Sequence, residues 1–429
     1  MQLVAYGAQD IYLTGNPQIT FFKVVYRRHT NFSMESIQQT LDGTADFDST
    51  VSCTISRNGD LVYRMYLEHE ASLKSFDTTD DNIGIGCDYG SHLMKQMDLE
   101  IGGQLIDRHY GHWHSAYSQL TEFNPSGATF GGDVGGTVTQ GTLYQKMSGN
   151  GNSIESQNNN NNNTNMGGWL IDSNTHGTQA EASGKFWIPL YFWFCRNPGL
   201  ALPLIALQYH EVKVKIVFES LIKLTLSADD ATFAGEANPA IKNTSGTNSF
   251  DLWCDYIYLD TDERRRFAQV SHEYLIEQVQ HQSSSGGNIK LNFNHPVKEL
   301  IWAGVRTTTA DEAPKLYEKD DLFNANTDTV KLTLNGHDRF APRNIRYFTR
   351  TQVWQHHTGY GSTQTDRDQI AVYSFALKPE EHQPSGTCNF SRIDNAQLVQ
   401  SAAKAVEVYA VNYNVLRIMS GMGGLAYSN

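Results

Sequence analysis

The chain has 429 residues, of which 18% are charged and 39% hydrophobic, and its formal net charge is −13. This length exceeds the size at which one hydrophobic core keeps growing, so we expect two domains. The acidic balance argues against a protein whose main task is to wrap nucleic acid, because that task needs a basic surface. The 21 tyrosines, 20 phenylalanines and 35 glycines favour many strands and tight turns over helical bundles.

The cysteines indicate a reducing, cytosolic compartment, because they are odd in number, widely separated and without C-x-x-C spacing. They are Cys53, Cys87, Cys195, Cys254 and Cys388. The first residues show no basic segment followed by an apolar one. The most apolar run, residues 200–207, is far shorter than the ~20 residues that span a bilayer. We expect no secretory signal and no membrane-spanning segment.

Residues 1–25 are expected to form an N-terminal arm. The stretch from Leu3 to Phe22 has no clean hydrophobic period and contains the turn Gly15-Asn16-Pro17. Such a segment has little core of its own, so we expect it to be ordered by docking on its own domain or on a neighbour.

Strand patterns begin at residue 21. Residues 21–26, 32–37, 51–55 and 61–67 are rich in β-branched and aromatic side chains. Asn58-Gly59 separates the last two, and Asn-Gly is a strong hairpin signal. The sequence therefore predicts that these two strands pair as a hairpin.

Two stretches look like one structural element used twice. In residues 97–106, apolar residues alternate with charged ones before the turn Gly102-Gly103. In residues 330–340, the same alternation precedes Asn335-Gly336. The alternation predicts strands with one buried face, and the turn residues predict tight hairpins. On this pair alone, duplication and coincidence explain the similarity equally well.

Residues 124–182 interrupt this series of strand patterns. The stretch is crowded with Gly, Ser, Thr and Asn, includes the run Asn158 to Asn163 and offers few apolar residues to bury. So long a connection is rare in a compact domain unless it is functional or disordered. We expect a long exposed loop that is flexible at the asparagine tract.

The strand pattern resumes after this loop. Residues 186–194 form a dense aromatic segment, residues 210–218 alternate without fault, and residues 253–259 form a further strand. The sharpest charge concentration in the chain follows at residues 260–266. We place the domain boundary in this segment.

The second part of the chain repeats this order in shorter form. Each part holds roughly eight short strands, the number in a jelly roll. The sequence thus predicts an all-β protein with two tandem eight-stranded jelly-roll β-sandwich domains, a double jelly roll, with few short helices in loops. The first domain would span residues 26–262 and the second residues 263–429.

The best candidate for a metal site is the segment with His109, His112 and His114, because imidazoles are common metal ligands. In a jelly roll, an H-x-H element suggests a cupin, whose metal site also needs a following glutamate and a P-x-G-x-x-H element. Here no acid follows before Glu122, and neither P-x-G element ends in histidine. We therefore predict no metal site.

No other motif supports catalysis. The His-Glu pairs lack the second histidine of a zincin, and the sequence contains no nucleophile elbow, Walker A loop or EF-hand loop. We predict no catalytic residue and no cofactor. The basic clusters Arg27-Arg28 and Arg264 to Arg266 fit solvated faces or subunit contacts better than phosphate sites.

N-x-S/T triplets begin at four asparagines. They are Asn31, Asn162, Asn243 and Asn389. Such triplets are frequent by chance, and cytosolic cysteines do not imply a secretory pathway. Asn162, Asn243 and Asn389 are kept as candidate glycosylation sites that would need another glycosylation route.

Several blocks of the chain closely resemble the major capsid proteins of large nucleocytoplasmic DNA viruses, especially those of algae. The run Pro198-Gly199-Leu200-Ala201-Leu202-Pro203-Leu204 is specific. The blocks are residues 6–10, 13–23, 26–28, 55–61, 198–211, 383–395 and 412–427. The sequence departs from the family pattern at residues 124–182, 304–330 and 397–405.

The resemblance implies a double jelly roll that forms a homotrimer, because three chains of two similar domains fill a hexagonal tile. It also implies contacts with neighbouring capsomers, with minor capsid proteins under the shell and with a nearby internal viral membrane at the arm, but no sequence-specific binding of nucleic acid. The expected location is the virion, after assembly in the host cytoplasm, with residues 124–182 on the outer face. The alternative is a carbohydrate-binding jelly-roll protein that mediates host attachment, motivated by aromatic residues near loops.

Overall fold

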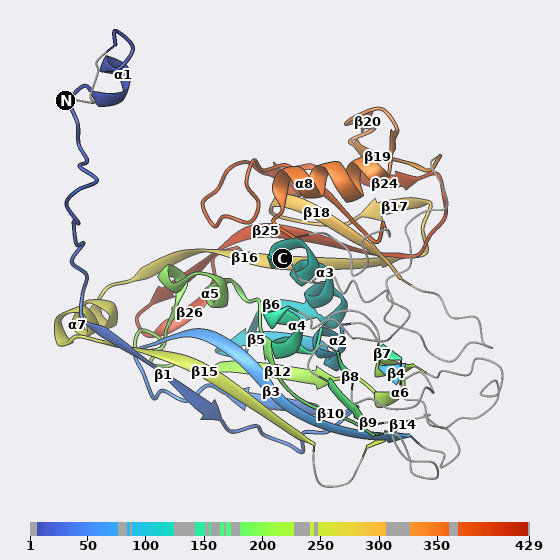
Figure 1. Ribbon diagram of the computed structural model, residues 1–429, viewed down its shortest axis with the longest axis horizontal. Helices are drawn as coiled ribbons and strands as arrows, with labels where there is room; N and C mark the ends of the chain where they lie inside the picture. The colour runs from blue at the N-terminus through green and yellow to red at the C-terminus, as the bar shows by residue number, and fades with distance from the viewer. Residues whose placement is uncertain are drawn as a thin grey trace, which may run out of the picture.

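The computed structural model shows two β-sandwiches with a short helix between them (Figure 1). The residues that it describes are 7–75, 84–85, 88–123, 142–150, 154–155, 164–166, 169–172, 181–226, 241–243, 248–305, 327–359 and 368–427.

The first sandwich consists of two antiparallel sheets from the N-terminal part of the chain. One sheet has the order β1 (Phe32–Gln39), β15 (Ser249–Leu259), β3 (Leu61–Ser75), β10 (Glu181–Pro189), β9 (Trp169–Asp172) and β8 (Thr164–Met166). The other has the order β2 (Thr50–Thr54), β12 (Val212–Phe218), β5 (Met94–Ile101) and β6 (Gln104–Tyr110). Five short strands accompany them: β4 (Gly84–Ile85), β7 (Ile154–Glu155), β11 (Leu202–Pro203), β13 (Thr225–Leu226) and β14 (Ile241–Asn243).

The second sandwich is built from the C-terminal part. One sheet has the order β16 (His272–Ser284), β25 (Val406–Met419), β18 (Pro296–Gly304) and β22 (Ile370–Ser374). The other has the order β17 (Asn288–Leu291), β24 (Ala396–Gln400), β19 (Thr329–Leu334) and β20 (His337–Asp338). The short strands are β21 (Arg343–Asn344), β23 (Cys388–Asn389) and β26 (Met422–Leu425).

The described helices are all short, as the sequence predicts. They are α1 (Ile11–Thr14), α2 (Tyr89–Leu93), α3 (Gly111–Thr121), α4 (Leu143–Ser148), α5 (Trp193–Arg196), α6 (Leu221–Leu224), α7 (Thr261–Gln269), α8 (Gln352–His356) and the single turns η1 (Pro198–Leu200), η2 (Tyr347–Thr351) and η3 (Phe390–Arg392). The link between the sandwiches is α7, which Asp260 caps by accepting a hydrogen bond from the Thr261 N–H. Among the described residues, no helix has the length and apolar character needed to span a bilayer.

The two sandwiches have the same strand order. When the eight main strands of each sandwich are numbered along the chain, one sheet reads 1-8-3-6 and the facing sheet 2-7-4-5 in both halves. This is an eight-stranded jelly roll repeated once, so the predicted double jelly roll is confirmed. The duplication inferred from the two hairpins is therefore real.

The two predicted hairpins are confirmed and occupy equivalent places, as strands 4 and 5 of each sandwich. The first is β5–β6, whose turn residues Gly102 and Gly103 have φ of 59° and 80°. The second is β19–β20, whose turn residues Asn335 and Gly336 have φ of 51° and 79°. Both turn residues need positive φ in a primed turn, which asparagine and glycine adopt at the least cost.

The prediction of a hairpin at Asn58-Gly59 is wrong. Strands β2 and β3, which flank this turn, lie in different sheets, so the chain crosses from one sheet to the other at this point. Neither residue has positive φ. The glycine is required by packing, because a Cβ at Gly59 would lie 2.8 Å from the Cβ of Tyr256 on β15.

The prediction of one long exposed loop over residues 124–182 also needs correction. Thr142 and Gln145 form a capping box that begins α4, and Tyr144 and Asn150 are buried against the first sandwich. Strands β8 and β9 extend the sheet beside β10. The asparagine tract from Asn158 to Asn163 lies outside the described residues.

Candidate functional site

Helix α3 joins the two sandwiches. It begins where β6 ends, and its apolar residues Trp113, Ala116, Tyr117 and Leu120 are buried. They form one core cluster with residues of the second sandwich. These partners are Ile301, Ala303, Val353, Ile370, Val372, Tyr409 and Val411. Because this cluster draws on both halves of the chain, separating the sandwiches would expose it to water.

The opposite face of α3 is bound to the first sandwich. The Ser115 hydroxyl donates a hydrogen bond to Asp88, and the Gln119 amide donates a second one at 3.4 Å. All three side chains are buried. Since one face of the helix is fixed to each sandwich, α3 sets the position of one sandwich relative to the other.

The C-terminal end of α3 contacts the second sandwich through the backbone. The Gly359 N–H donates to the Leu120 carbonyl at 2.7 Å. A Cβ at Gly359 would lie only 2.2 Å from the Gln119 carbonyl oxygen, so only glycine fits without movement. This bond satisfies one of the carbonyl groups that a helix leaves unpaired at its end.

A buried ion network lies beside α3. Glu277 on β16 contacts the Arg196 guanidinium of α5 and the Lys298 ammonium of β18, each at 2.7 Å. Lys298 and Glu277 are at most 3% exposed, and Arg196 belongs to the first sandwich. Arg196 also donates to the Tyr117 hydroxyl on α3 at 2.6 Å. Burial by itself would raise the pKa of Glu277, but the two cations outweigh it and hold that pKa well below its usual range.

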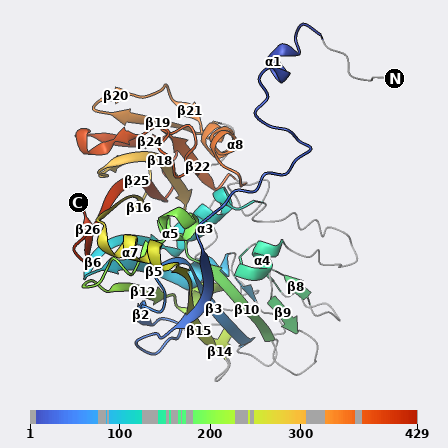
Figure 2. The ribbon, with the colours of Figure 1, turned by 90° about the vertical axis from the view of Figure 1, so that its left-hand side faces the viewer.

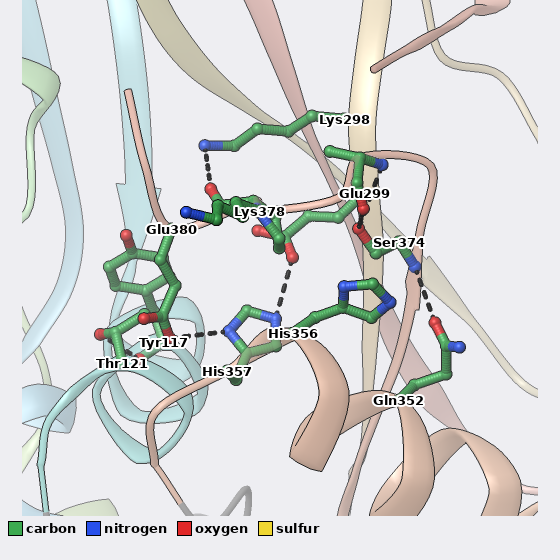
Figure 3. A network of polar contacts seen from close by, with 12 residues as sticks. Tyr117, Thr121, Lys298, Glu299, Gln352, His356, His357, Ser374, Lys378 and Glu380 are labelled. Atoms are coloured by element: carbon green, nitrogen blue, oxygen red, sulfur yellow. Dashed lines mark hydrogen bonds and ion pairs between the residues drawn. The ribbon is translucent and has the colours of Figure 1, made fainter. Parts of the chain in front are cut away.

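A buried histidine lies between two carboxylates in the same region (Figure 3). The His357 Nε2 atom is 3.0 Å from Glu299, and Nδ1 is 3.1 Å from Glu380. Thr358 donates its N–H and its hydroxyl to the same Glu380 carboxylate. Burial by itself would lower the pKa of His357, but the two carboxylates raise it to about 9. The imidazole is therefore charged at neutral pH.

These charged groups stabilise the fold by pairing with one another. Removing charged groups from water is costly unless each one is paired, and here the two cations, the imidazole and the carboxylates satisfy one another. Perturbed pKa values often mark catalytic sites, but buried ion pairs produce them as well. Arg196 pairs with Glu277 across the junction, so this ion pair holds the two sandwiches in one arrangement, whereas His357, Glu299 and Glu380 pair within the second sandwich.

The three histidines of the candidate metal segment point to different places. His109 lies 2.9 Å from Asp107, and His112 lies 2.8 Å from the Tyr409 hydroxyl of the second sandwich. His114 is fully buried against the Tyr191 ring, and burial lowers its pKa well below the ordinary value. Over the part of the chain that the structure describes, no group of three potential ligands is placed to hold a metal. His112 is instead a junction residue.

Sequence reasoning missed the network at the junction. Lys298 and Glu299 stand in β18, which is buried from Val297 to Gly304, and two charges beside this apolar run were the available signal. Glu277 stands in β16, most of which is only half-buried, so no such signal marked it. Charged residues are rarely fully buried unless they are paired. The pattern flags Lys298 and Glu299, but their partners come from distant parts of the chain.

The candidate glycosylation sites are scattered. Asn162 lies outside the described residues, and Asn243 ends β14. Asn389 is exposed, and its Oδ1 atom accepts a hydrogen bond from the Ser391 N–H at 3.0 Å. Among the basic clusters, Arg264 pairs with Asp60 at 2.9 Å.

The N-terminal arm leaves the body of the molecule (Figures 1 and 2). From residue 7 to residue 30, within the part of the chain that the structure describes, its hydrogen bonds join residues of this segment to one another. Phe21 and Phe22 are 92% and 98% exposed. Other large apolar residues are also exposed: Ile11, Tyr12, Leu13, Ile19, Val24, Val25 and Tyr26. Apolar surface of this kind marks an interaction segment.

Comparison with known proteins covers the whole chain. Residues 20–260 match the family described as "Major capsid protein N-terminus", and residues 263–424 match the "Large eukaryotic DNA virus major capsid protein" family. The chain is 47% identical over 455 residues to the major capsid protein of Pyramimonas orientalis virus, with 100% of this chain and 99% of the relative covered. It is 39% identical over 489 residues to that of Paramecium bursaria Chlorella virus 1, with the same coverage.

A solved structure resembles it as well. This is PBCV-1 VP54, a crystal structure fitted into a cryo-EM reconstruction of the virophage Sputnik. The TM-score is 0.71 and the sequence identity 36%, with 96% of this chain and 100% of that chain covered.

Proposed function

Because the chain belongs to the major capsid proteins of large eukaryotic DNA viruses, we propose that three copies of it associate around a threefold axis into a pseudo-hexagonal capsomer. Its function is structural: it is a component of the virion and forms an icosahedral shell together with neighbouring capsomers. The family and its solved relatives support this function.

The repeated strand order is the observation that best supports the proposed trimer. Each chain has two sandwiches with the same order of strands, so three chains place six similar sandwiches around the threefold axis. A ring of such units approximates sixfold symmetry, which lets a threefold particle fill a hexagonal tile.

The junction supports the same proposal. A tile keeps its outline only if the two sandwiches of each chain keep a fixed orientation. The cluster around α3 and the ion network around Glu277 provide that constraint within a single chain.

Light scattering of the purified chain tests the proposal. We expect a particle of three times the 48.1 kDa chain mass, and a hexagonal outline in negative-stain images. A stable monomer or dimer contradicts it. A monomer that binds sugars in a glycan array would instead favour the carbohydrate-binding alternative.

We also propose an orientation for the chain in the shell. The arm of residues 1–25 faces the interior, near minor capsid proteins and an internal membrane, and residues 124–182 lie on the outer face. Assembly takes place in the host cytoplasm. The exposed apolar arm supports an inward contact, because such residues need cover. Protease should cleave free capsomers within the first 18 residues of the arm but leave the same residues of intact virions uncut, whereas equal cleavage of both contradicts the inward placement.

The domain division and the glycosylation sites are proposals of the same kind. We place the domains at residues 26–262 and 263–429, since the main strands of each sandwich come from one side of this boundary. Sugar on Asn389 would leave its Oδ1 hydrogen bond in place, because N-linked sugar attaches to the nitrogen. Mass spectrometry of virion peptides covering Asn162, Asn243 and Asn389 tests this: unmodified peptides contradict it.

A further inference from the structure

The end of the arm and the residues that follow it form a basic segment of an acidic protein. Between residues 11 and 34 the chain carries Lys23, Arg27 and Arg28 but no aspartate or glutamate, although the whole chain has a net charge of −13. Large apolar side chains accompany these cations and are exposed. A partner for this segment therefore needs an apolar surface with carboxylates.

The body of the molecule has a cavity of about 760 Å³ with this character. It lies where β3, β10, α3, α4 and α5 meet. Five aromatic side chains line it: Tyr66, Tyr117, Tyr144, Trp187 and Tyr191. The volume is in the range that accommodates several side chains of a bound segment. Phe123 and Leu143, each 83% exposed, adjoin the lining residues Glu122 and Tyr144 and extend the apolar surface.

The charges of this cavity complement those of the arm. Its lining includes the carboxylates of Glu122, Asp255 and Glu380, against the guanidinium groups of Arg64 and Arg196. Arg196 is already paired with the buried Glu277, and Glu380 with the charged His357, so both charges are compensated inside the protein. Glu122 and Asp255 then outnumber Arg64 by one charge, and the cavity therefore favours a cationic occupant.

Glu122 is the carboxylate best placed to gain from such an occupant. Burial raises its pKa, and among the described residues its one hydrogen bond comes from the Tyr191 hydroxyl at 3.1 Å. A guanidinium placed beside a partly buried carboxylate forms a charge-assisted, bidentate hydrogen bond. Arg27 or Arg28 supplies that group.

We propose that the arm segment of residues 19–28 in one copy docks in this cavity of a neighbouring copy. The inference rests on the proposed function, which supplies the neighbouring copies. The body of the molecule begins at Phe32, the first residue of β1, and a fully extended chain places residues 28 and 19 up to about 13 Å and 43 Å from it. The segment can therefore reach a neighbour that packs beside this end of β1. The docked arm covers its phenylalanines against the aromatic lining and places its cations beside the carboxylates.

Zero-length carbodiimide cross-linking tests the docking, because it joins an amine to a carboxylate that it touches. Particles are assembled from a mixture of unlabelled and ¹⁵N-labelled chains, cross-linked, digested and analysed by mass spectrometry. We expect Lys23 to be joined to Glu122, Asp255 or Glu380 in peptide pairs of mixed label. In Lys23→Arg, which keeps the charge but lacks the amine, these products should disappear while the particle mass is unchanged.

Charge reversal provides a second readout. Glu122→Lys should lower the yield of the mixed-label products by about tenfold or more, because it repels the arm. The combined change Arg27→Glu and Arg28→Glu should do the same, and joining it to Glu122→Lys should restore part of the yield. Glu211→Lys, an exposed change outside the cavity, is the matched control and should leave the yield unchanged.

The outcomes separate this inference from the proposed function. A trimer in which Lys23 joins no cavity carboxylate overturns the docking but leaves the trimer standing. Products of single label only show that the arm folds back into its own cavity, which also overturns it. A monomer without mixed-label products contradicts both proposals.

Discussion

The imidazole of His357 lies 3.0 Å from the Glu299 carboxylate, and neither side chain is more than 1% exposed. With Glu380 on the other ring nitrogen, the pKa of His357 is raised to about 9. Because this folded-state pKa lies above the ordinary value of 6.5, the stabilisation is fully present below about pH 6.5 and is lost as the pH rises through 9.

The first prediction follows from the upward shift of the His357 pKa. Between pH 7 and pH 9.5 the free energy of unfolding should fall by up to about 3 kcal/mol through this group. Urea unfolding at several pH values measures it. His357→Gln should be less stable at pH 7 and show a smaller loss on raising the pH. His356→Gln is the control and should keep the native slope, because the His356 ring contacts the backbone carbonyl of Leu377 at 3.2 Å rather than a carboxylate.

The second prediction concerns the buried carboxylate of Glu277. Glu277→Gln removes the charge that compensates Arg196 and Lys298, so we expect a loss of about 3 to 5 kcal/mol in the free energy of unfolding. Glu273→Gln, on the same strand, breaks an exposed pair with Arg417 and should cost less than about 1 kcal/mol. Equal effects in chemical denaturation would contradict the structural role of the network.

The third prediction tests the contact at the end of α3. Gly359→Ala places a methyl group where the Gln119 carbonyl lies 2.2 Å away, so the junction must open locally. We expect a loss of roughly 2 kcal/mol or more, as overpacking usually gives. Gly103→Ala has open space and should show only the cost of positive φ, about 1 kcal/mol. Thermal unfolding of both variants distinguishes lack of space from backbone strain.

The fourth prediction concerns thiol reactivity. Burial raises the pKa of Cys53 and of Cys195 to about 12, and Cys254 is buried as well. The thiolate is the reactive form, so these thiols should react with a disulfide reagent about 100-fold more slowly in the native protein than in urea. Cys388, which is half-buried, should react faster than these three. Peptide mapping after timed labelling checks the order, and rapid native labelling of Cys53 would contradict it.

Much of the fold could be predicted because its signals are local. The alternation before Gly102-Gly103 and before Asn335-Gly336 reports a strand with one buried face and a turn that needs positive φ. Both properties depend on residues a few positions apart. The same local rule failed at Asn58-Gly59, because the pairing of the flanking strands is decided by partners far along the chain.

The segment around α4 shows a second case in which local sequence signals do not predict the structure. Its composition indicates a loop, but the capping box between Thr142 and Gln145 starts a helix and Asn150 is buried through hydrogen bonds to Ser91 and Tyr144. A few well-placed polar bonds therefore order a stretch that hydrophobicity alone assigns to solvent.

The sequence by itself determined the strands, most of their turns, the duplication and, through its resemblance to capsid proteins, the family. Only the tertiary structure decided that Glu277 meets Arg196 and Lys298, that His357 lies between two carboxylates, and that α3 belongs to both sandwiches. The physical reason is that a buried charge is stable only beside a partner, and tertiary packing, not position in the chain, brings that partner near: Arg196 comes from the other sandwich, and Glu299 and Glu380 come from distant parts of the same one.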